Sequence, residues 1–164
     1  MTMEQVDSMT QAEFVASFAD VFEHSPWVAE QAYAVRPFQT MQGLCLEMQK
    51  QVEAASREKQ MALICAHPDL GTRARVSESS ANEQSSAGLD RLSSEEYGRL
   101  LQLNQAYKEK FAFPFLFAVR GSGKQEILTA LELRLRATPA QEFGEALRQI
   151  YRIARYRLEE KLTQ

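Results

Sequence analysis

Apolar residues recur at helical spacing along most of this chain. Phe14, Phe18 and Phe22 stand four positions apart, which places them on one face of a helix. The same interval separates three apolar residues further on, Leu44, Met48 and Val52. This periodicity predicts a protein built from amphipathic helices.

Capping residues and prolines predict several helix ends. Thr10 with Glu13 and Ser93 with Glu96 match the capping box, in which the hydroxyl and the carboxylate each accept a hydrogen bond from the other residue's backbone N–H. Ser25-Pro26 indicates an N-cap followed by proline in the first turn. We therefore expect two helices in the first quarter of the chain.

The same signals predict the remaining helices. Residues 40–66 have a helical pattern with a break near Ala55-Ser56, and a later helix ends near Lys110. Ser122 or Gly123 begins a helix that ends near Arg136. Thr138-Pro139 begins a last helix that reaches Lys161.

One apolar run departs from helical spacing. Residues 111–119, FAFPFLFAV, are apolar enough for a strand, but Pro114 cannot donate to a central ladder and no second strand-like run is present to pair with it. We expect a buried, mostly extended or irregular segment. The whole chain, 1–164, is predicted to be all-α, a single-domain bundle of about seven to nine helices.

Charge and composition narrow the range of partners. The chain has 19 basic and 22 acidic residues, a net charge of -3, and no long basic stripe, so we expect neither nucleic acid nor a membrane surface as a partner. It also lacks the run of about 18 apolar residues that a membrane span needs. Cys45 and Cys65 form no CxxC motif, and we expect both to be core residues of a cytoplasmic protein.

His67 is a candidate for proton transfer. It follows an apolar helical run, and Pro68 disfavours the helical conformation at His67, so the imidazole is expected at a helix exit. An imidazole titrates near neutral pH, which suits a general acid or base. A histidine that caps the last carbonyls of its helix explains the same pattern, and both interpretations stay open.

Ser80 and Glu83 also match the capping box, and Gln84 follows them. In that interpretation Glu83 returns a hydrogen bond to the backbone of Ser80 and a helix begins there. The free N–H groups of a helix N-terminus favour an anionic ligand, so the two residues are compatible with both a helix start and a carboxylate site.

Arg157 lies in the middle of the apolar stripe of the last helix, between the directions of Ile150 and Ile153, if residues are about 100° apart. A buried arginine needs a partner, and its planar fork suits a carboxylate or an imide-like ligand. Pairing with a structural Asp or Glu, or snorkelling at the helix end, remains an alternative.

Two other kinds of site are not expected. Residues 121–124, GSGK, resemble a phosphate loop, but Ala118 stands where a glycine is required and Gln125 where Ser or Thr is required. The histidines and cysteines lack zinc-ligand spacing, so we expect no metal.

Taken in order, the motifs resemble the 2-oxo-4-hydroxy-4-carboxy-5-ureidoimidazoline (OHCU) decarboxylase family of urate degradation. Each motif is short, and it is their ordered combination along most of the chain that is specific. They are residues 22–30 (FEHSPWVAE), 67–70 (HPDL), Ser80-x-x-Glu83-Gln84, Asn104-x-x-Tyr107, 113–115 (FPF), Glu142-Phe143 and 152–158 (RIARYRL).

This resemblance implies an all-helical, cofactor-independent carboxy-lyase, a homodimer, that converts OHCU to (S)-allantoin and carbon dioxide. It implies that His67, Glu83 and Arg157 are catalytic. Further contacts with the substrate are implied for Pro68, Ser80, Gln84, Phe113 and the backbone of Phe115, Leu116, Phe117, Ala118 and Val119.

Gly71-Thr72-Arg73 departs from the Ala-Gly that is commoner in the family at this point. Because this segment is a loop, we expect the departure to change its conformation and to leave the chemistry unchanged. Two other functions stay open. One is a non-enzymatic helical interaction module, in which the motifs are caps and core. The other is a lyase or hydrolase that acts on a related ureide or hydantoin.

Overall fold

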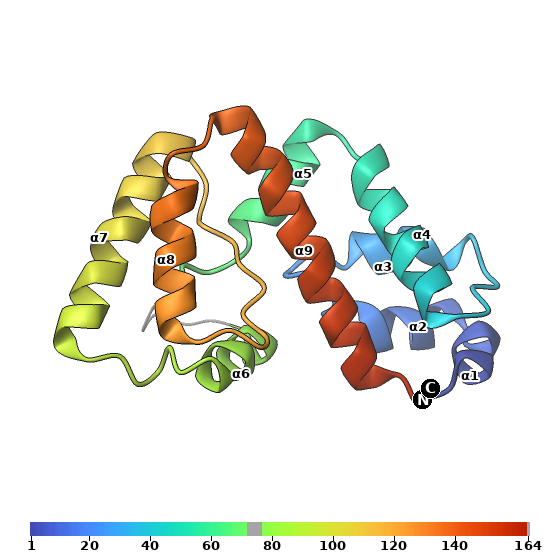
Figure 1. Ribbon diagram of the computed structural model, residues 1–164. Coiled ribbons are helices and arrows are strands. Elements are labelled where there is room, and N and C mark those ends of the chain that lie inside the picture. Colours follow the sequence, from blue (N-terminus) through green and yellow to red (C-terminus); the bar gives the residue numbers. More distant parts are fainter. Residues whose placement is uncertain (72–76, 164) are drawn as a thin grey trace. The chain divides into compact units, whose positions relative to one another are not determined.

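The computed structural model describes residues 1–71 and 77–163, and over these residues the protein contains nine helices and no strand (Figure 1). This confirms the all-α prediction. The helices are α1 (Met3–Ser8), α2 (Gln11–Phe18), α3 (Trp27–Tyr33), α4 (Met41–Ala54), α5 (Arg57–Cys65), α6 (Glu78–Ser86), α7 (Ser94–Phe111), α8 (Lys124–Arg134) and α9 (Pro139–Lys161).

The chain divides into two compact units. The first unit contains Met1–Ala66 together with the chain from Tyr151 onward, and the second contains His67–Ile150. The division falls inside α9, which therefore contributes residues to both. The prediction of a single domain stays a prediction.

The core of the first unit is centred on Phe14 of α2. Its ring lies 4.8 Å from the ring of Phe18 and 5.6 Å from that of Phe38, and all three side chains are buried. α2 contacts α3, and α3 contacts α4. Both chain ends belong to this unit, because the backbone N–H of Thr163 donates to the carbonyl of Met1 at 2.8 Å.

The core of the second unit lies along α7 and α8, which run side by side (Figure 1). Leu100 and Tyr107 of α7 and Ile127 and Leu131 of α8 are almost completely buried. These residues repeat at intervals of four or seven, as expected for the inner faces of two packed helices. The helical periodicity in the sequence is thus explained by burial.

The segment after α7 is irregular, as predicted. α7 ends at Phe111, and Ala112 takes a left-handed conformation with φ 63° while its N–H donates to the carbonyl of Lys108. No strand or helix is formed from there to the start of α8, although Phe113 and Phe115 are buried. The segment therefore needs side-chain partners for its peptide groups.

Several predicted helix ends are confirmed. The break near Ala55-Ser56 separates α4 from α5, and the Ser56 hydroxyl caps α5 by accepting from the N–H of Lys59 at 3.2 Å. α9 begins at Pro139, where Thr138 and Gln141 exchange backbone–side-chain hydrogen bonds. These helix ends could be predicted because a capping residue lies within a few positions of the helix end that it caps.

Two expectations for the amino-terminal helices were wrong. Three helices, not two, precede residue 40, because Thr2 and Gln5 form a capping box for the short α1. Ser25 does not cap α3. Its hydroxyl donates instead to the carbonyl of Glu23 at 2.9 Å, and Pro26 occupies the N-cap position.

The prediction for the cysteines was also wrong. Cys45 is half-buried and Cys65 is exposed, so neither is a core residue.

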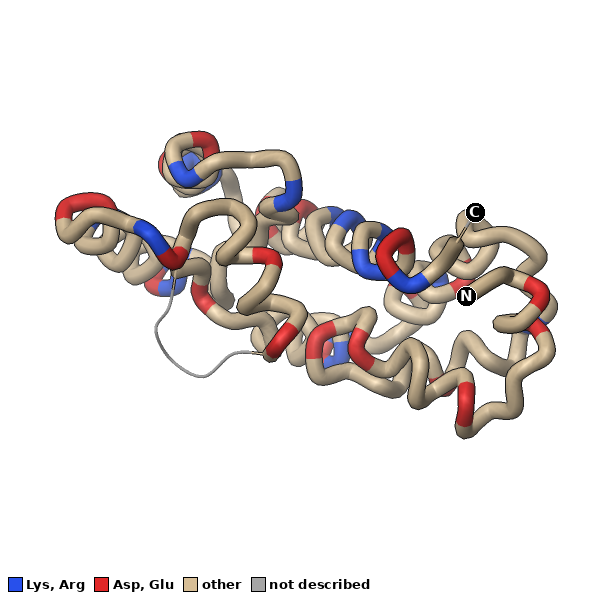
Figure 2. Tube along the Cα trace, turned by 90° about the horizontal axis from the view of Figure 1, so that it is seen from below, with Lys and Arg blue, Asp and Glu red and all other residues tan. Residues whose placement is uncertain are grey.

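Among the described residues, no helix is both long enough and apolar enough to cross a membrane. Figure 2 shows acidic and basic positions interspersed along the described chain, in keeping with its small net charge.

The capping box of α7 provides a stability prediction. The Ser93 hydroxyl accepts from the N–H of Glu96 at 3.1 Å, and the N–H of Ser93 donates to the Glu96 carboxylate at 3.0 Å. Ser93→Ala is expected to lower the free energy of unfolding by about 1 kcal/mol, measured by urea denaturation. The neighbouring exposed serine is the control: Ser94→Ala should change it by less than about 0.5 kcal/mol.

Candidate active site

His67 stands at the exit of α5, as the sequence predicted. α5 ends at Cys65, and His67 and Pro68 follow in non-helical conformation. The His67 side chain is buried, with 7% of its surface exposed, whereas Pro68 is half-buried. A buried imidazole keeps a defined position, which a group that transfers protons to a substrate requires.

The turn that carries His67 is fixed by two amide side chains. The Asn104 amide donates from Nδ2 to the carbonyl of Leu70 at 3.0 Å. The backbone N–H of Gly71 donates to Oε1 of Gln84 at 2.9 Å. Both hydrogen bonds are buried, so the residues just after His67 are joined to α7 and α6.

Gly71 is required at the end of this turn. Its φ is 72°, in the region that favours glycine, and a Cβ atom there would lie 2.3 Å from Cδ2 of Leu100. An exposed ion pair between Asp69 and Lys108, at 3.2 Å, adds little stability to the same turn. Thr72 and Arg73, where departure from the family pattern was noted, lie outside the described residues.

The predicted capping box at Ser80 is wrong. α6 begins at Glu78, and Ser77 is its N-cap, whose hydroxyl accepts from the N–H of Ser80 at 3.2 Å. Ser80 and Glu83 are therefore inside the helix, and Glu83 does not begin it. The argument for an anion site at a helix start does not apply to these two residues.

α6 nevertheless presents the predicted residues on one side. Ser80, Gln84 and Ala87 are buried and repeat at intervals of four and three, which defines the inner face of the helix. Glu83 is half-buried at the edge of that face. Gln84 also accepts from Gly71, so α6 and the His67 turn belong to one arrangement.

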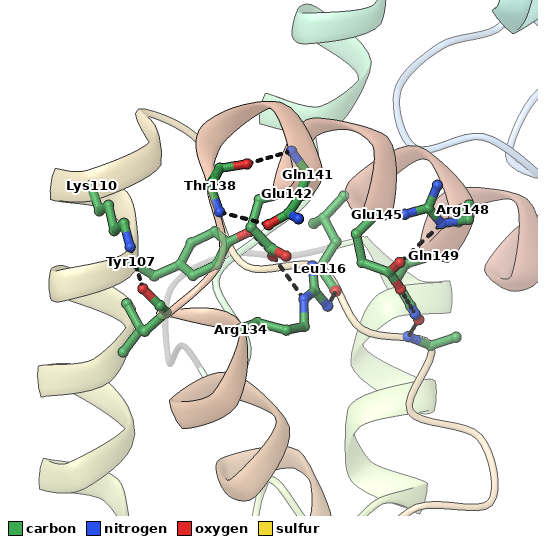
Figure 3. Close-up of polar contacts among 12 residues, drawn as sticks. Tyr107, Lys110, Leu116, Arg134, Thr138, Gln141, Glu142, Glu145, Arg148 and Gln149 are labelled. Atoms are coloured by element: carbon green, nitrogen blue, oxygen red, sulfur yellow. Dashed lines mark hydrogen bonds and ion pairs between the residues drawn. The ribbon is translucent and has the colours of Figure 1, made fainter.

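A buried polar network that the sequence analysis missed lies beside the irregular segment (Figure 3). The Tyr107 hydroxyl donates to Oε1 of Glu142 at 2.5 Å, and Nε of Arg134 donates to the same oxygen at 2.8 Å. Burial and the hydrogen bond to Glu142 raise the pKa of Tyr107, so its hydroxyl stays protonated as a donor. The Tyr107 and Glu142 motifs were visible in the sequence, but their contact was not.

The irregular segment is attached to this network and to α9. Arg134 donates through Nη1 to the carbonyl of Leu116, and its guanidinium lies 4.5 Å from the centre of the Phe115 ring. The N–H of Ala118 donates to Oε1 of Gln149 at 2.9 Å. Two of the peptide groups predicted to contact substrate are thus engaged within the protein.

Aromatic packing supports the first part of the same segment. The Phe113 and Phe115 rings lie 6.0 and 5.4 Å from that of Tyr107, both edge-on, and Phe113 is also edge-on to Phe143 at 6.3 Å. Leu116, Ala118 and Val119 are buried, and Phe117 is half-buried. Whether these residues contact a substrate stays a prediction.

Arg157 is buried in the first unit, as the helical wheel predicted. Its side chain is 4% exposed, and Nη2 forms an ion pair with Oε2 of Glu23 at 2.9 Å. Nη1 donates to the carbonyls of Asp20 and Val21 at 3.1 and 3.5 Å. Pairing with a structural carboxylate, one of the two interpretations left open, is therefore present. Its proposed role beside residues of the second unit stays a prediction.

The described side chains include groups that can take part in acid–base chemistry. Residues 1–71 and 77–163 contain no group of three or more His, Cys, Asp or Glu side chains arranged to hold a metal ion. The second unit contains a buried imidazole, His67, and a half-buried carboxylate, Glu83. The first unit, described by itself, contains the buried guanidinium of Arg157.

Comparison with known sequences decides the family. A profile described as OHCU decarboxylase matches residues 7–159. The chain belongs to the OHCU decarboxylase family. The match spans His67, Glu83 and Arg157. The prediction of a carboxy-lyase of urate degradation is confirmed, in preference to a non-enzymatic helical module.

Relatives agree with this assignment. The chain is 42% identical over 163 residues to the 2-oxo-4-hydroxy-4-carboxy-5-ureidoimidazoline decarboxylase of Haloferax volcanii, covering 99% of this chain and 97% of that one. It is 43% identical to the uric acid degradation bifunctional protein PucL of Bacillus subtilis, covering 99% of this chain but only 33% of that protein. The part that is similar to this chain thus makes up nearly all of the first relative and one third of the second.

Solved structures have the same fold. The crystal structure of (S)-allantoin synthase superposes with a TM-score of 0.82 at 32% identity, covering 99% of this chain and 54% of that one. A crystal structure of OHCU decarboxylase in the presence of (S)-allantoin superposes with a TM-score of 0.73 at 24% identity, covering 88% and 96%. At 24% identity the second structure shows likeness of fold alone.

The two glycines Gly71 and Gly98 provide a matched test of the His67 turn. Gly71→Ala is expected to lower the free energy of unfolding by about 1–3 kcal/mol, because it combines a positive φ with the contact to Leu100. Gly98→Ala, in α7 with open space around the added Cβ, should raise it by about 0.5–1 kcal/mol. Urea denaturation measures both, and equal effects would contradict a special role for Gly71.

Proposed function

We propose that this chain decarboxylates OHCU to (S)-allantoin and carbon dioxide with His67, Glu83 and Arg157 as its catalytic residues. The assignment of these residues is supported by the turn after His67, which is held by buried hydrogen bonds. The Gly71 N–H is bound by Gln84, the neighbour of Glu83 on α6, so the turn that carries the imidazole and the helix that carries the carboxylate form one arrangement. The family supplies the substrate class.

The substrate itself supplies the electron sink. OHCU carries its carboxylate on a ring carbon that also bears a hydroxyl and adjoins the C=N carbon that bears the ureido group. When the bond to the carboxylate breaks, the electron pair left behind forms a C=C bond to the ureido-bearing carbon, and the C=N electrons move to the ring nitrogen, which takes up a proton. The hydroxyl then loses its proton as its carbon becomes a carbonyl, and the ureido-bearing carbon takes up a proton to give allantoin. The protein therefore has to hold the substrate, stabilise the developing negative charge and deliver a proton to the ureido-bearing carbon.

His67 is assigned to the substrate hydroxyl and to proton delivery. The imidazole is buried and precedes a turn that is held at Leu70 and Gly71, and we assign it to deliver the proton to one face of the substrate. Protonation from one side yields one enantiomer, which agrees with an (S) product. A positioned proton donor accelerates a reaction by roughly 10²- to 10⁴-fold.

α6 is assigned to the polar arms of the substrate. The Glu83 carboxylate accepts hydrogen bonds, so it either binds ureido N–H groups or orients His67. Gln84 already uses Oε1 to accept from Gly71, which leaves its amide N–H₂ as the end that it can offer to a substrate oxygen. Ser80 and Pro68 complete this group of contacts.

Arg157 is assigned to the negative charge of the substrate. A guanidinium binds oxygen atoms in a fixed fork. Here the Glu23 carboxylate and the carbonyl of Asp20, in the turn after α2, hold that fork in place. Phe113 is assigned to packing against the ring, and the main chain of 115–119 to hydrogen bonds with it. We also propose a homodimer in the cytoplasm. The homodimer follows the family resemblance and is testable by light scattering coupled to size exclusion.

The first test compares the two histidines. His67→Asn is expected to lower turnover at least tenfold and to leave the far-ultraviolet circular dichroism intact. OHCU is generated in solution from urate, and the optical activity of allantoin is followed with time. His24→Asn is the matched control, because His24 is exposed and its φ of 47° suits asparagine, so turnover should be unchanged. Normal turnover of His67→Asn would remove His67 from the mechanism.

The second test concerns Arg157. Arg157→Lys is expected to raise KM about tenfold or more, because an ammonium cannot reproduce the guanidinium fork. Arg152→Lys, at an exposed position of the same helix, should leave KM unchanged. An unaltered KM in Arg157→Lys would make Arg157 a structural partner of Glu23. Racemic allantoin formed at the spontaneous rate by the unmodified chain would overturn the proposed function itself.

A further inference from the structure

We infer that Gln149 and Arg134 are positioning residues that aim the main-chain N–H and C=O of Phe117 at the substrate, as a donor and an acceptor for its ureido or ring amide group. The inference rests on the proposed function, in which the main chain of 115–119 contacts OHCU. It adds two side chains that do not themselves touch the substrate.

Gln149 is held so that only its oxygen faces the segment (Figure 3). Its Nε2 donates to Oε1 of Glu145 at 2.8 Å, and Nε of Arg148 donates to the other Glu145 oxygen at 2.9 Å. An ionised carboxylate can only accept, so the amide cannot turn round. Oε1 of Gln149 therefore receives the N–H of Ala118, at 2.9 Å in a buried position.

The protonation state of Glu145 agrees with this arrangement. Burial by itself raises the pKa of its carboxyl group, but the hydrogen bonds from Gln149 and Arg148 outweigh burial and keep the pKa below its usual value. Glu145 is therefore a carboxylate at neutral pH, and the orientation of Gln149 is fixed over the range in which the enzyme is expected to work.

Arg134 holds the segment from another direction. One end of its guanidinium donates to the buried Glu142 carboxylate, and Nη1 donates to the carbonyl of Leu116. The Phe115 ring lies against the guanidinium. Because Glu142 is also bound by Tyr107, the guanidinium has little freedom to rotate.

These two contacts fix the two peptide groups on either side of Phe117. The carbonyl of Leu116 and the N–H of Phe117 belong to one planar peptide, and the carbonyl of Phe117 and the N–H of Ala118 belong to the next. In a trans peptide the N–H and C=O point in opposite directions, and Arg36-Pro37 is the one cis bond recorded among the described residues. The Phe117 N–H thus points away from Arg134, and its C=O away from Gln149.

Burial singles out the same residue. Phe115, Leu116, Ala118 and Val119 are all buried, whereas Phe117 is half-buried. One N–H donor and one C=O acceptor on a single half-buried residue match a ligand that offers C=O and N–H side by side, as ureido and imidazolone groups do. This pair distinguishes such a substrate from a simple keto acid, which offers no N–H.

The test replaces the acceptor for Ala118. Gln149→Met keeps the size of the side chain but removes the oxygen, and KM for OHCU is expected to rise about tenfold, the effect of losing about 1.4 kcal/mol of binding. KM does not depend on how much of the enzyme is folded, so a loss of stability alone would not move it. Gln102→Met, at an exposed position of α7, is the control and should have a normal KM.

A double variant provides the rescue. Gln149→Glu with Glu145→Gln exchanges the two groups, so residue 149 still offers an oxygen to Ala118 and still receives a hydrogen bond from residue 145. KM is expected to return to within about threefold of the unmodified enzyme. If the KM of the double variant were as high as that of Gln149→Met, the hydrogen bond to Ala118 would not be what positions the main chain for the substrate.

Arg134→Lys is an independent test of the inference, and it remains available if Gln149→Met fails to fold. A lysine cannot bind Glu142 and Leu116 at once with a rigid fork, so KM should rise, whereas Arg99→Lys, in an exposed pair with Glu132, should not change it. Normal KM values in both Gln149→Met and Arg134→Lys would overturn the inference and leave the proposed function standing. An unmodified chain without activity on OHCU would overturn both.

Discussion

The buried carboxylate of Glu142 is the interaction on which the second unit depends. It lies on α9 and binds Tyr107 of α7 and Arg134 at the end of α8, so one oxygen joins three helices. An unpaired carboxylate costs several kcal/mol to bury, and the two donors compensate for the loss of water. Helices that pack through apolar side chains could slide by a turn, but this contact permits one register.

Two irregular parts of the second unit are held in the same way. The turn after His67 and the irregular segment before α8 are both stretches of main chain without regular hydrogen bonding, and both are held by amide side chains: Asn104 and Gln84 in the first case and Gln149 in the second. A neutral amide satisfies a buried peptide group without adding charge. Both stretches of main chain are therefore held without a further charge beside them.

Local signals explain which parts of the fold were predictable. Capping boxes with Glu or Gln at the third helical position identified the starts of α2 and α7, whereas α6 is capped by Ser77 with a serine at that position, so Ser80 and Glu83 were mistaken for the start. α1 was missed because it is six residues long and has one buried side chain, too few to show a period. Helical spacing, by contrast, is repeated often enough to be unambiguous in the longer elements.

Partners of buried polar groups could not be predicted in the same way. The wheel placed Arg157 inside, yet its partner Glu23 is 134 positions away, and Glu142 is 35 positions from Tyr107. Periodicity shows that a charge is buried but not what neutralises it. Several of these residues belong to the family motifs in the sequence. The structure shows which atoms each of them binds.

The support of the irregular segment acts on main-chain atoms, and this has a consequence for how the family can diverge. Every residue type has a carbonyl to offer at position 116, and every type except proline has an N–H to offer at position 118. Side chains in this stretch can therefore be exchanged over evolutionary time while the frame is retained, provided that Arg134 and Gln149 stay. The position of the main chain in this segment can therefore be conserved while the sequence of the segment changes.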